Sequence, residues 1–318
     1  MMAASEVSRT RAWLMAARPQ TLPAGASPVV VGTGLALHDG VFAPAAALAA
    51  LVGALLIQIG TNFANDYYDA VRGADTADRE GFERVTQSGL IPPARVKRAM
   101  WATFGLAVLV GTSLVYVGGV PILVVGLASV ASGIAYTGGP WPFGYKGLGD
   151  LFVFVFFGLV AVTGTYYVQA AAALPGVGPF PLWVPGGTLP AAAVAASLPA
   201  AGLSTAILLV NNIRDLETDR AAGKRTLAVV IGYRWSRVEF VALVGMAYVV
   251  PVLFAVDPRF GPPALAPLAT LPLAVRVGRT VLTRTGGDAL NPALERVGQL
   301  LFAHSALFAL GLAAPAVI

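Results

Sequence analysis

The chain has 318 residues, of which 57% are hydrophobic and 12% are charged, and its mean hydropathy is +0.74. A soluble domain carries about 25% charged residues, so this composition indicates a membrane protein rather than a soluble one. The sequence contains no cysteine, which excludes disulfide bonds and thiolate metal sites. The net charge of +5 does not predict a nucleic-acid partner, because the placement of the charges matters more than their sum.

Nine apolar segments have roughly the 20 residues that a helix needs to cross a bilayer. The first follows an Arg-containing start without a clear cleavage site, and further spans come after it, so we interpret it as part of the mature protein rather than as a signal peptide. The fold predicted is an all-α membrane protein, a nine-helix bundle with one transmembrane domain over residues 1–318. The segments are 21–37, 43–64, 99–117, 119–136, 149–171, 190–211, 237–256, 263–283 and 297–316.

The basic residues alternate between the loops and so predict the topology. The N-terminal segment 1–20 and every second loop hold nearly all Lys and Arg, whereas the other loops hold only Arg259. Because basic loops stay in the cytoplasm, we expect a multi-pass protein of the cell membrane with its N-terminus inside and its C-terminus outside. Two of the cytoplasmic loops, 65–98 and 212–236, also carry clustered acids, which topology does not explain because carboxylates contribute little to orientation.

Those two loops contain similar acidic motifs, each of which ends a predicted helix. In both, an Asn precedes an Asp by one turn and another Asp follows about one turn later, so that the three side chains share a helix face. The motifs lie four spans apart, which hints at an internal duplication. The positions are Asn62, Asp66 and Asp69, with Asn65 one turn before Asp69, and then Asn211, Asp215 and Asp219.

Such acids predict a metal site. Clustered carboxylates repel one another unless a cation lies between them, and oxygen ligands without His or Cys favour Mg²⁺, Mn²⁺ or Ca²⁺. Mg²⁺ typically takes a few carboxylates and completes its shell with substrate phosphate oxygens and water. Basic residues beside both motifs fit a bound polyanion. They are Arg72, Arg79, Arg84, Arg214, Arg220, Lys224 and Arg225.

Several nearby residues have a second interpretation. Asp78, Glu80 and Glu83 fit solvated loop charges. Lys146 fits either a positive-inside anchor or a point charge that pairs with a diphosphate oxygen. The Phe-rich run 152–157 fits bulk that faces the bundle or the lipid, and part of it could line a groove for an apolar chain.

The two motifs resemble those of the UbiA superfamily of intramembrane aromatic prenyltransferases. The family pattern is Asn-Asp-x-x-Asp with a further Asp downstream, followed by Asp-x-x-x-Asp in the later half. Both are present here, although Asp75 lies two positions later than the third Asp of the commonest form. Residues 65–79, 87–93 and 211–232 resemble the branch of the superfamily that acts on 1,4-dihydroxy-2-naphthoate in menaquinone biosynthesis.

The resemblance implies a bundle with a central cavity open sideways to lipid. It also implies Mg²⁺-dependent transfer of a polyprenyl group, with Mn²⁺ as a possible substitute, from polyprenyl diphosphate to 1,4-dihydroxy-2-naphthoate. Diphosphate and CO2 would leave, giving demethylmenaquinol. On this interpretation the metal ligands are Asp66, Asp69, Asp215, Asp219 and Asn65, with Lys146 and Tyr136 as further catalytic residues. Substrate contacts come from Asn62, Asn65, Asn211, Arg84, Tyr145, Lys224, Arg225 and Asp75.

Two alternatives compete with this interpretation. One is a related prenyltransferase with another acceptor, such as 4-hydroxybenzoate or a haem or tocopherol precursor, against which the stretches 87–93 and 219–225 argue. The other is a divalent-cation transporter, which would need carboxylates near the bilayer midplane, whereas these acids cluster at one face. The prenyl chain length and the oligomeric state do not follow from the sequence.

Overall fold

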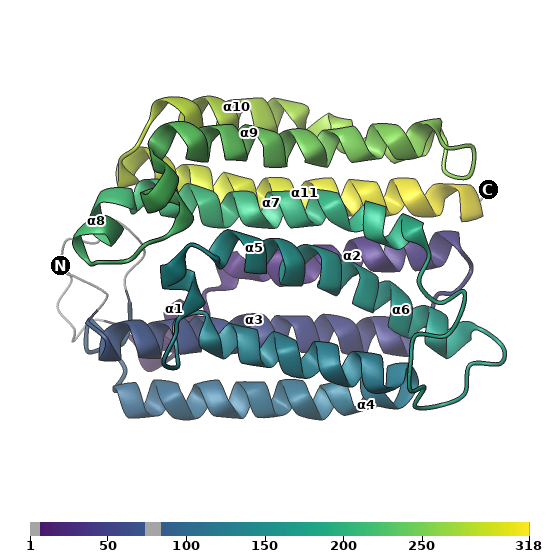
Figure 1. Ribbon diagram of the computed structural model, residues 1–318, viewed down its shortest axis with the longest axis horizontal. Coiled ribbons are helices and arrows are strands. Elements are labelled where there is room, and N and C mark those ends of the chain that lie inside the picture. Colours follow the sequence, from purple (N-terminus) through teal and green to yellow (C-terminus); the bar gives the residue numbers. More distant parts are fainter. Residues whose placement is uncertain (1–6, 74–83, 318) are drawn as a thin grey trace.

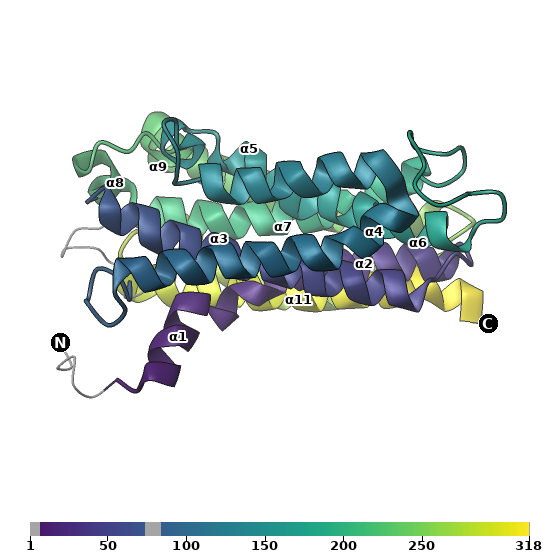
Figure 2. The same cartoon turned by 90° about the horizontal axis from the view of Figure 1, so that it is seen from below.

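The computed structural model describes residues 7–73 and 84–317, and this part of the chain consists of helices and loops without a strand. The long helices lie side by side along the longest axis of the molecule (Figures 1 and 2). They are α1 (Arg9–Ala17), α2 (Leu22–His38), α3 (Pro44–Val71), α4 (Pro93–Ala135), α5 (Gly149–Phe154), α6 (Ala161–Ala173), α7 (Ala191–Arg214), α8 (Leu216–Ala221), α9 (Leu227–Val256), α10 (Leu271–Thr283) and α11 (Gly287–Val317). Short 3₁₀ segments cover Pro19–Thr21, Phe143–Lys146 and Pro262–Thr270, and a π-helical turn, Val155–Val160, joins α5 to α6.

Seven helical segments in the described residues are long and apolar enough to cross a membrane. The prediction of an all-α, multi-pass membrane protein is therefore confirmed. All nine predicted spans overlap helices, but two of them, 99–117 and 119–136, lie within α4, and α2 has only 17 residues. The seven segments are α3, α4, the stretch 149–173, α7, α9, the stretch 262–283 and α11.

α4 consists of two antiparallel halves. Its 43 residues would extend about 65 Å as one rod, roughly twice the apolar thickness of a bilayer. Gly119 interrupts it with φ 62° and ψ −149°. Phe104 of the first half meets Gly133 of the second, because a Cβ added to Gly133 would lie 3.4 Å from the Phe104 ring. The halves therefore form a hairpin, and they pass one another beside α3 in Figure 1.

The loop between α6 and α7 closes the end of this hairpin. The backbone N–H of Val120 donates to the carbonyl of Pro181 at 2.9 Å, and that of Phe180 donates to the carbonyl of Tyr116 at 2.8 Å. These bonds satisfy backbone groups that the break at Gly119 would otherwise leave unpaired. The uncharged loop is thus part of the packed structure of α4.

The interior is built around α7, which is buried along most of its length and lies in the middle of the bundle in Figure 1. Small residues allow its neighbours to approach closely: a Cβ added to Gly158 would lie 2.1 Å from the Cβ of Ala201 in α7. Such small-residue contacts are typical of helix packing in membranes, where lipid removes the hydrophobic driving force between helices. The core beside α7 includes Leu35, Tyr166 and Phe308.

We predict that Gly119→Ala destabilises the hairpin. A Cβ at this position would lie 1.8 Å from the carbonyl oxygen of Pro181, and the positive φ disfavours any L side chain. The expected cost is about 2–4 kcal/mol, visible as a lower thermal unfolding midpoint in detergent. Gly105→Ala is the matched control, because an added Cβ there meets nothing within 4 Å. Equal midpoints for the two variants would contradict the prediction.

Candidate active site

The first acidic motif lies on the last turns of α3, which continues to Val71, beyond the predicted end of the span. Asp66 and Asp69 are buried, at 1% and 3% exposed. Thr86 Oγ1 donates to Asp66 Oδ2 at 2.9 Å, and Arg84 Nη2 donates to Asp69 Oδ2 at 2.9 Å. Buried carboxylates need such partners, because an unpaired buried charge costs several kcal/mol. The segment before α4 therefore folds back over the end of α3.

The second motif lies at the junction of α7 and α8. Arg214 donates from Nε and Nη2 to the two carboxylate oxygens of Asp215, both at 2.7 Å. The same guanidinium donates to Asn211 Oδ1 and Asn291 Oδ1, each at 2.7 Å. This forked geometry fixes the carboxylate in orientation as well as in charge. Asp219 follows one turn later and is also buried.

Tyr145 connects the two motifs. Its hydroxyl donates to Asp69 Oδ1, and Lys224 Nζ lies 5.1 Å from the centre of its ring. Lys224 Nζ also lies 3.5 Å from Asp219 Oδ1. The backbone N–H of Arg225 donates to the carbonyl of Tyr145 at 3.0 Å. A continuous path, Asp69–Tyr145–Lys224–Asp219, therefore joins acids from opposite halves of the sequence through one hydrogen bond, one cation–π contact and one ion pair.

The two Asn residues of the first motif make different contacts. Asn65 is half-buried and accepts a hydrogen bond from Thr137 Oγ1 at 3.0 Å, which ties α3 to the loop after α4. The amide nitrogen of Asn62 donates to the carbonyl of Ala17 at 2.9 Å and to Thr21 Oγ1 at 2.8 Å. Asn62 therefore holds the N-terminal segment against α3.

The remaining predicted residues divide into two groups. Lys146 and Arg225 have exposed side chains, and each is a chain neighbour of a residue in the Tyr145 path. Asp75, by contrast, lies outside the described residues. So do Arg79, Asp78, Glu80 and Glu83.

Tyr136 follows the last residue of α4 and lies between the acids and the interior. Burial raises its pKa, and the carboxylates of Asp150, Asp69 and Asp219 raise it further. Asp69 and Asp219 both act on this one phenol, so the two motifs lie within electrostatic range of a common point. A phenol is protonated at neutral pH even at its ordinary pKa, so Tyr136 can serve as a hydrogen-bond donor.

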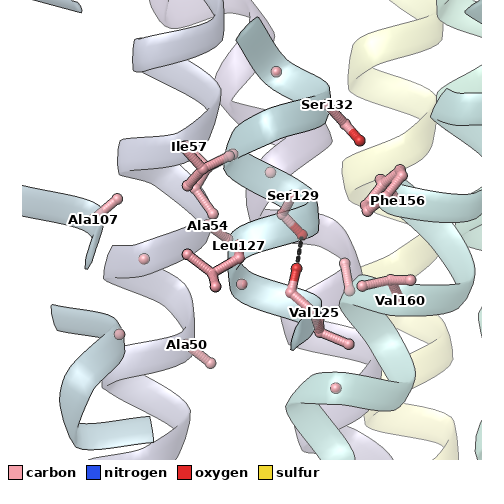
Figure 3. A pocket seen from close by; sticks show the side chains of 18 of the residues that line it. Ala50, Ala54, Ile57, Ala107, Val125, Leu127, Ser129, Ser132, Phe156 and Val160 are labelled. Atoms are coloured by element: carbon pink, nitrogen blue, oxygen red, sulfur yellow. Dashed lines mark hydrogen bonds between the residues drawn. The ribbon is translucent and has the colours of Figure 1, made fainter. Parts of the chain in front are cut away.

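An apolar cavity of about 350 Å³ extends from Tyr136 into the bundle. Figure 3 shows Ala54 and Ile57 of α3, Ser129 of α4 and Phe156 of the π-helical turn around it. The π-helical turn widens the helix where it meets the cavity, a location typical of such turns. Phe152, Phe156 and Phe157 of the predicted Phe-rich run line the cavity, together with Phe143 and with Thr61, one turn before Asn65.

The donor set fits Mg²⁺, although the protein groups alone do not complete an ion's shell. Within residues 7–73 and 84–317, no three carboxylate or imidazole groups converge closely enough to hold an ion by themselves. Mg²⁺ is usually bound by one or two carboxylates, with substrate phosphates and water as the other ligands. Each motif offers two buried carboxylates at helical spacing. Arg84, Arg214 and Lys224 lie beside them and suit a polyanionic substrate.

Three contacting residues were not predicted from the sequence: Thr86, Thr137 and Asn291. Each comes from an element other than the motif it supports, so no local spacing indicates it. The role of Arg214 could be predicted from the sequence, because an Arg directly before a motif Asp is available for a forked ion pair.

Comparisons with known proteins give the family and the fold. The pattern of the UbiA prenyltransferase family matches residues 26–305. The chain is 38% identical to the 1,4-dihydroxy-2-naphthoate octaprenyltransferase of Escherichia coli (strain K12), over 98% of each chain. In fold it is similar to a UbiA homolog from Aeropyrum pernix K1, with a TM-score of 0.66, 14% identity, and 88% of this chain and 96% of the other covered.

It is also similar in fold to a UbiA homolog from Archaeoglobus fulgidus bound to DMAPP and Mg²⁺. That comparison has a TM-score of 0.58 and 16% identity, and it covers 93% of this chain and 98% of the other. The family pattern spans most of the chain, and it includes the two acidic helix ends and the cavity between them. The chain belongs to the UbiA prenyltransferase family.

Proposed function

We propose that this protein transfers a polyprenyl group from polyprenyl diphosphate to 1,4-dihydroxy-2-naphthoate, with release of diphosphate and CO2, and so makes demethylmenaquinol for menaquinone biosynthesis. The observation that carries the proposal is that two buried acid pairs lie near Tyr136, a residue that lines the apolar cavity. The name and the 38% identity of the Escherichia coli relative support this acceptor. The Archaeoglobus homolog, bound to DMAPP and Mg²⁺, supports a prenyl diphosphate donor and a divalent metal, with Mn²⁺ as a possible substitute.

The membrane arrangement that fits this function has nine crossings in one domain, 1–318. α2 has 17 residues, within the range that spans a bilayer, and the hairpin at Gly119 counts as two crossings. The basic loops support an orientation with the N-terminus and the acidic motifs in the cytoplasm and the C-terminus outside the cell membrane. The loops 65–98 and 212–236 complete the active site in this arrangement.

In the reaction, the bond between the prenyl carbon and diphosphate breaks while a bond forms to the ring carbon that carries the carboxylate. The bond from that ring carbon to the carboxylate then breaks, CO2 leaves, and the electron pair of the broken bond restores the aromatic ring. Mg²⁺, when bound, neutralises the charge that develops on the leaving diphosphate. Asp66, Asp69, Asp215 and Asp219 would hold the ions, with Asn65 and Asn211 as further oxygen donors. Arg84, Lys224, Lys146 and Arg225 would contact phosphate oxygens.

The two tyrosines and the cavity have separate tasks. Tyr145 positions Asp69 and Lys224, and Tyr136, which lines the cavity, can donate a hydrogen bond to the diphosphate. The apolar cavity would hold the prenyl chain and keep water from the allylic carbon while it carries positive charge. Val108 and Leu127, which line the cavity from the two halves of α4, are 48% and 56% exposed. Their exposure supports a side opening through which a lipid-soluble donor enters.

The choice of acceptor is tested with the purified protein in vesicles, supplied with Mg²⁺, one polyprenyl diphosphate and equal amounts of 1,4-dihydroxy-2-naphthoate and 4-hydroxybenzoate. We expect demethylmenaquinol by mass spectrometry, with one CO2 and one diphosphate released per product. Prenylation of 4-hydroxybenzoate alone would contradict the assigned acceptor but leave the prenyl transfer intact.

The acid pairs are tested with Asp66→Asn. An amide oxygen can still accept the hydrogen bond from Thr86, whereas the negative charge that would hold Mg²⁺ is lost. We expect turnover to fall by about 100-fold or more, and the Mg²⁺ concentration for half-maximal rate to rise. Glu217→Gln is the matched control, because Glu217 lies inside the second motif but is 62% exposed and pairs with Arg220. Near-normal turnover in Asp66→Asn would remove Asp66 from the site.

The cavity is tested with Gly126→Leu. Gly126 lines the cavity, and a Cβ added to it meets nothing within 4 Å, so a larger side chain fills open space rather than clashing. We expect the ratio of turnover with a short donor to turnover with a long donor to rise about 10-fold. Gly105→Leu also has open space but lies away from the lining, so it should leave the ratio unchanged. An unchanged ratio in Gly126→Leu would place the prenyl chain elsewhere.

A further inference from the structure

α10 has an unusual outward face. Ala274, Val277 and Val281 are its buried residues. Arg276 and Arg279 lie three residues apart on the face opposite to these and are both exposed. In the other long helices the exposed face is mainly apolar, as at Leu109 and Leu253. α10 therefore presents two cations where a spanning helix is expected to present lipid-soluble side chains.

These two arginines belong to a segment, 262–283, that is long and apolar enough to cross the membrane. Their neighbours Val275 and Leu282 are 50% and 40% exposed, as expected of residues that face lipid. A charge that faces lipid is costly unless its side chain reaches the interface. Arg276 and Arg279 lie about 10 Å and 6 Å before the end of α10 at Thr283, in about the last two turns of the helix. Long basic side chains near helix ends extend toward the headgroups.

In the part of the chain that the structure describes, no carboxylate forms an ion pair with Arg276 or Arg279. The acids that follow in the sequence, Asp288 and Glu295, are exposed on α11 and pair with neither of them. Two outward cations without a protein partner are complementary to an anion supplied by the surroundings.

The end of α9 that lies beside these arginines has the residue types expected at a membrane boundary. Trp235 is 58% exposed, and the guanidinium of Arg234 lies 5.8 Å from its ring. Exposed Trp side chains beside cations are typical of the interface between apolar chains and headgroups. Arg237 donates to the carbonyls of Val281 and Arg284, both at 3.1 Å, and so fixes the end of α10 against α9. This contact holds the two arginines at the boundary.

We propose that Arg276 and Arg279, with Arg284 at the helix end, bind the phosphate of an anionic phospholipid. Guanidinium groups pair with phosphate through two parallel N–H bonds, and basic residues at the cytoplasmic end of membrane helices attract anionic headgroups. The site lies on the outward face of α10 and uses none of the residues assigned to diphosphate. It gives the protein a lipid ligand distinct from its prenyl donor.

The experiment compares the full-length protein with Arg276→Gln/Arg279→Gln, each in nanodiscs of phosphatidylcholine and phosphatidylglycerol. Bound lipid is counted by native mass spectrometry after release. We expect the wild type to retain phosphatidylglycerol preferentially, and the double variant to lose roughly 5- to 30-fold in that preference. Arg95→Gln/Arg98→Gln is the matched control, with the same spacing and exposure on α4, and it should keep the preference.

A variant with lysine at both positions adds a second readout. It keeps the charges but loses the paired N–H geometry, so its preference should lie between those of the wild type and the Gln variant. Equal retention in the wild type and the Gln variant, or an equal loss in the α4 control, overturns the proposal. Loss of self-association in the Gln variant, with lipid retention unchanged, would assign the face to a second copy of the chain. Unfolding midpoints in zwitterionic detergent establish that each variant is folded.

Discussion

The structure depends on keeping several carboxylates buried at one end of a membrane bundle. Buried acids repel one another and lose their hydration, so each needs a partner of its own. Arg84 pairs with Asp69, Arg214 with Asp215, and Lys224 with Asp219. Every partner comes from a segment adjacent to a helix end, so satisfying the acids also defines the fold of the loops around them. In the proposed reaction, a diphosphate with its metal ions would enter this region.

Tyr145 makes the two halves of the site one unit. It touches Asp69 through its hydroxyl and Lys224 through its ring, and the loop that carries it runs between the α4 hairpin and α5. The same loop carries Phe143, which lines the cavity. The polar and the apolar parts of the substrate would therefore meet at a single short segment, and a shift of that segment would affect both. This coupling suits a reaction in which charge leaves at one end of a bond while an apolar chain stays bound at the other.

The arginines of this protein serve two different physical roles. Arg84 and Arg214 point inward, are nearly inaccessible and pair with acids, so their positions are determined by the fold. Arg276 and Arg279 point outward from α10 and have no acid beside them in the described structure, so the bilayer is the partner that remains. The inward arginines belong to the proposed active site, whereas the outward arginines form the proposed lipid site.

The sequence by itself determined the helices and the acid motifs, because both depend on residues close together in the chain: the length of an apolar run and the spacing of the acids. Apolar runs of bilayer length predicted the spans, including a division at residue 118, next to the break at Gly119. The turn spacing of Asp66, Asp69, Asp215 and Asp219 predicted two acidic helix ends. Contacts between segments that are distant in the sequence produce no regular spacing of residues, so the sequence does not predict them. Only the tertiary structure showed that Thr86 and Asn291 support these acids, that Asn62 is directed to the N-terminal segment, and that Tyr145 joins the motifs. The cavity was also decided by packing, because its volume depends on how glycines of α2, α3, α4 and α6 meet the phenylalanines of the segment 143–157.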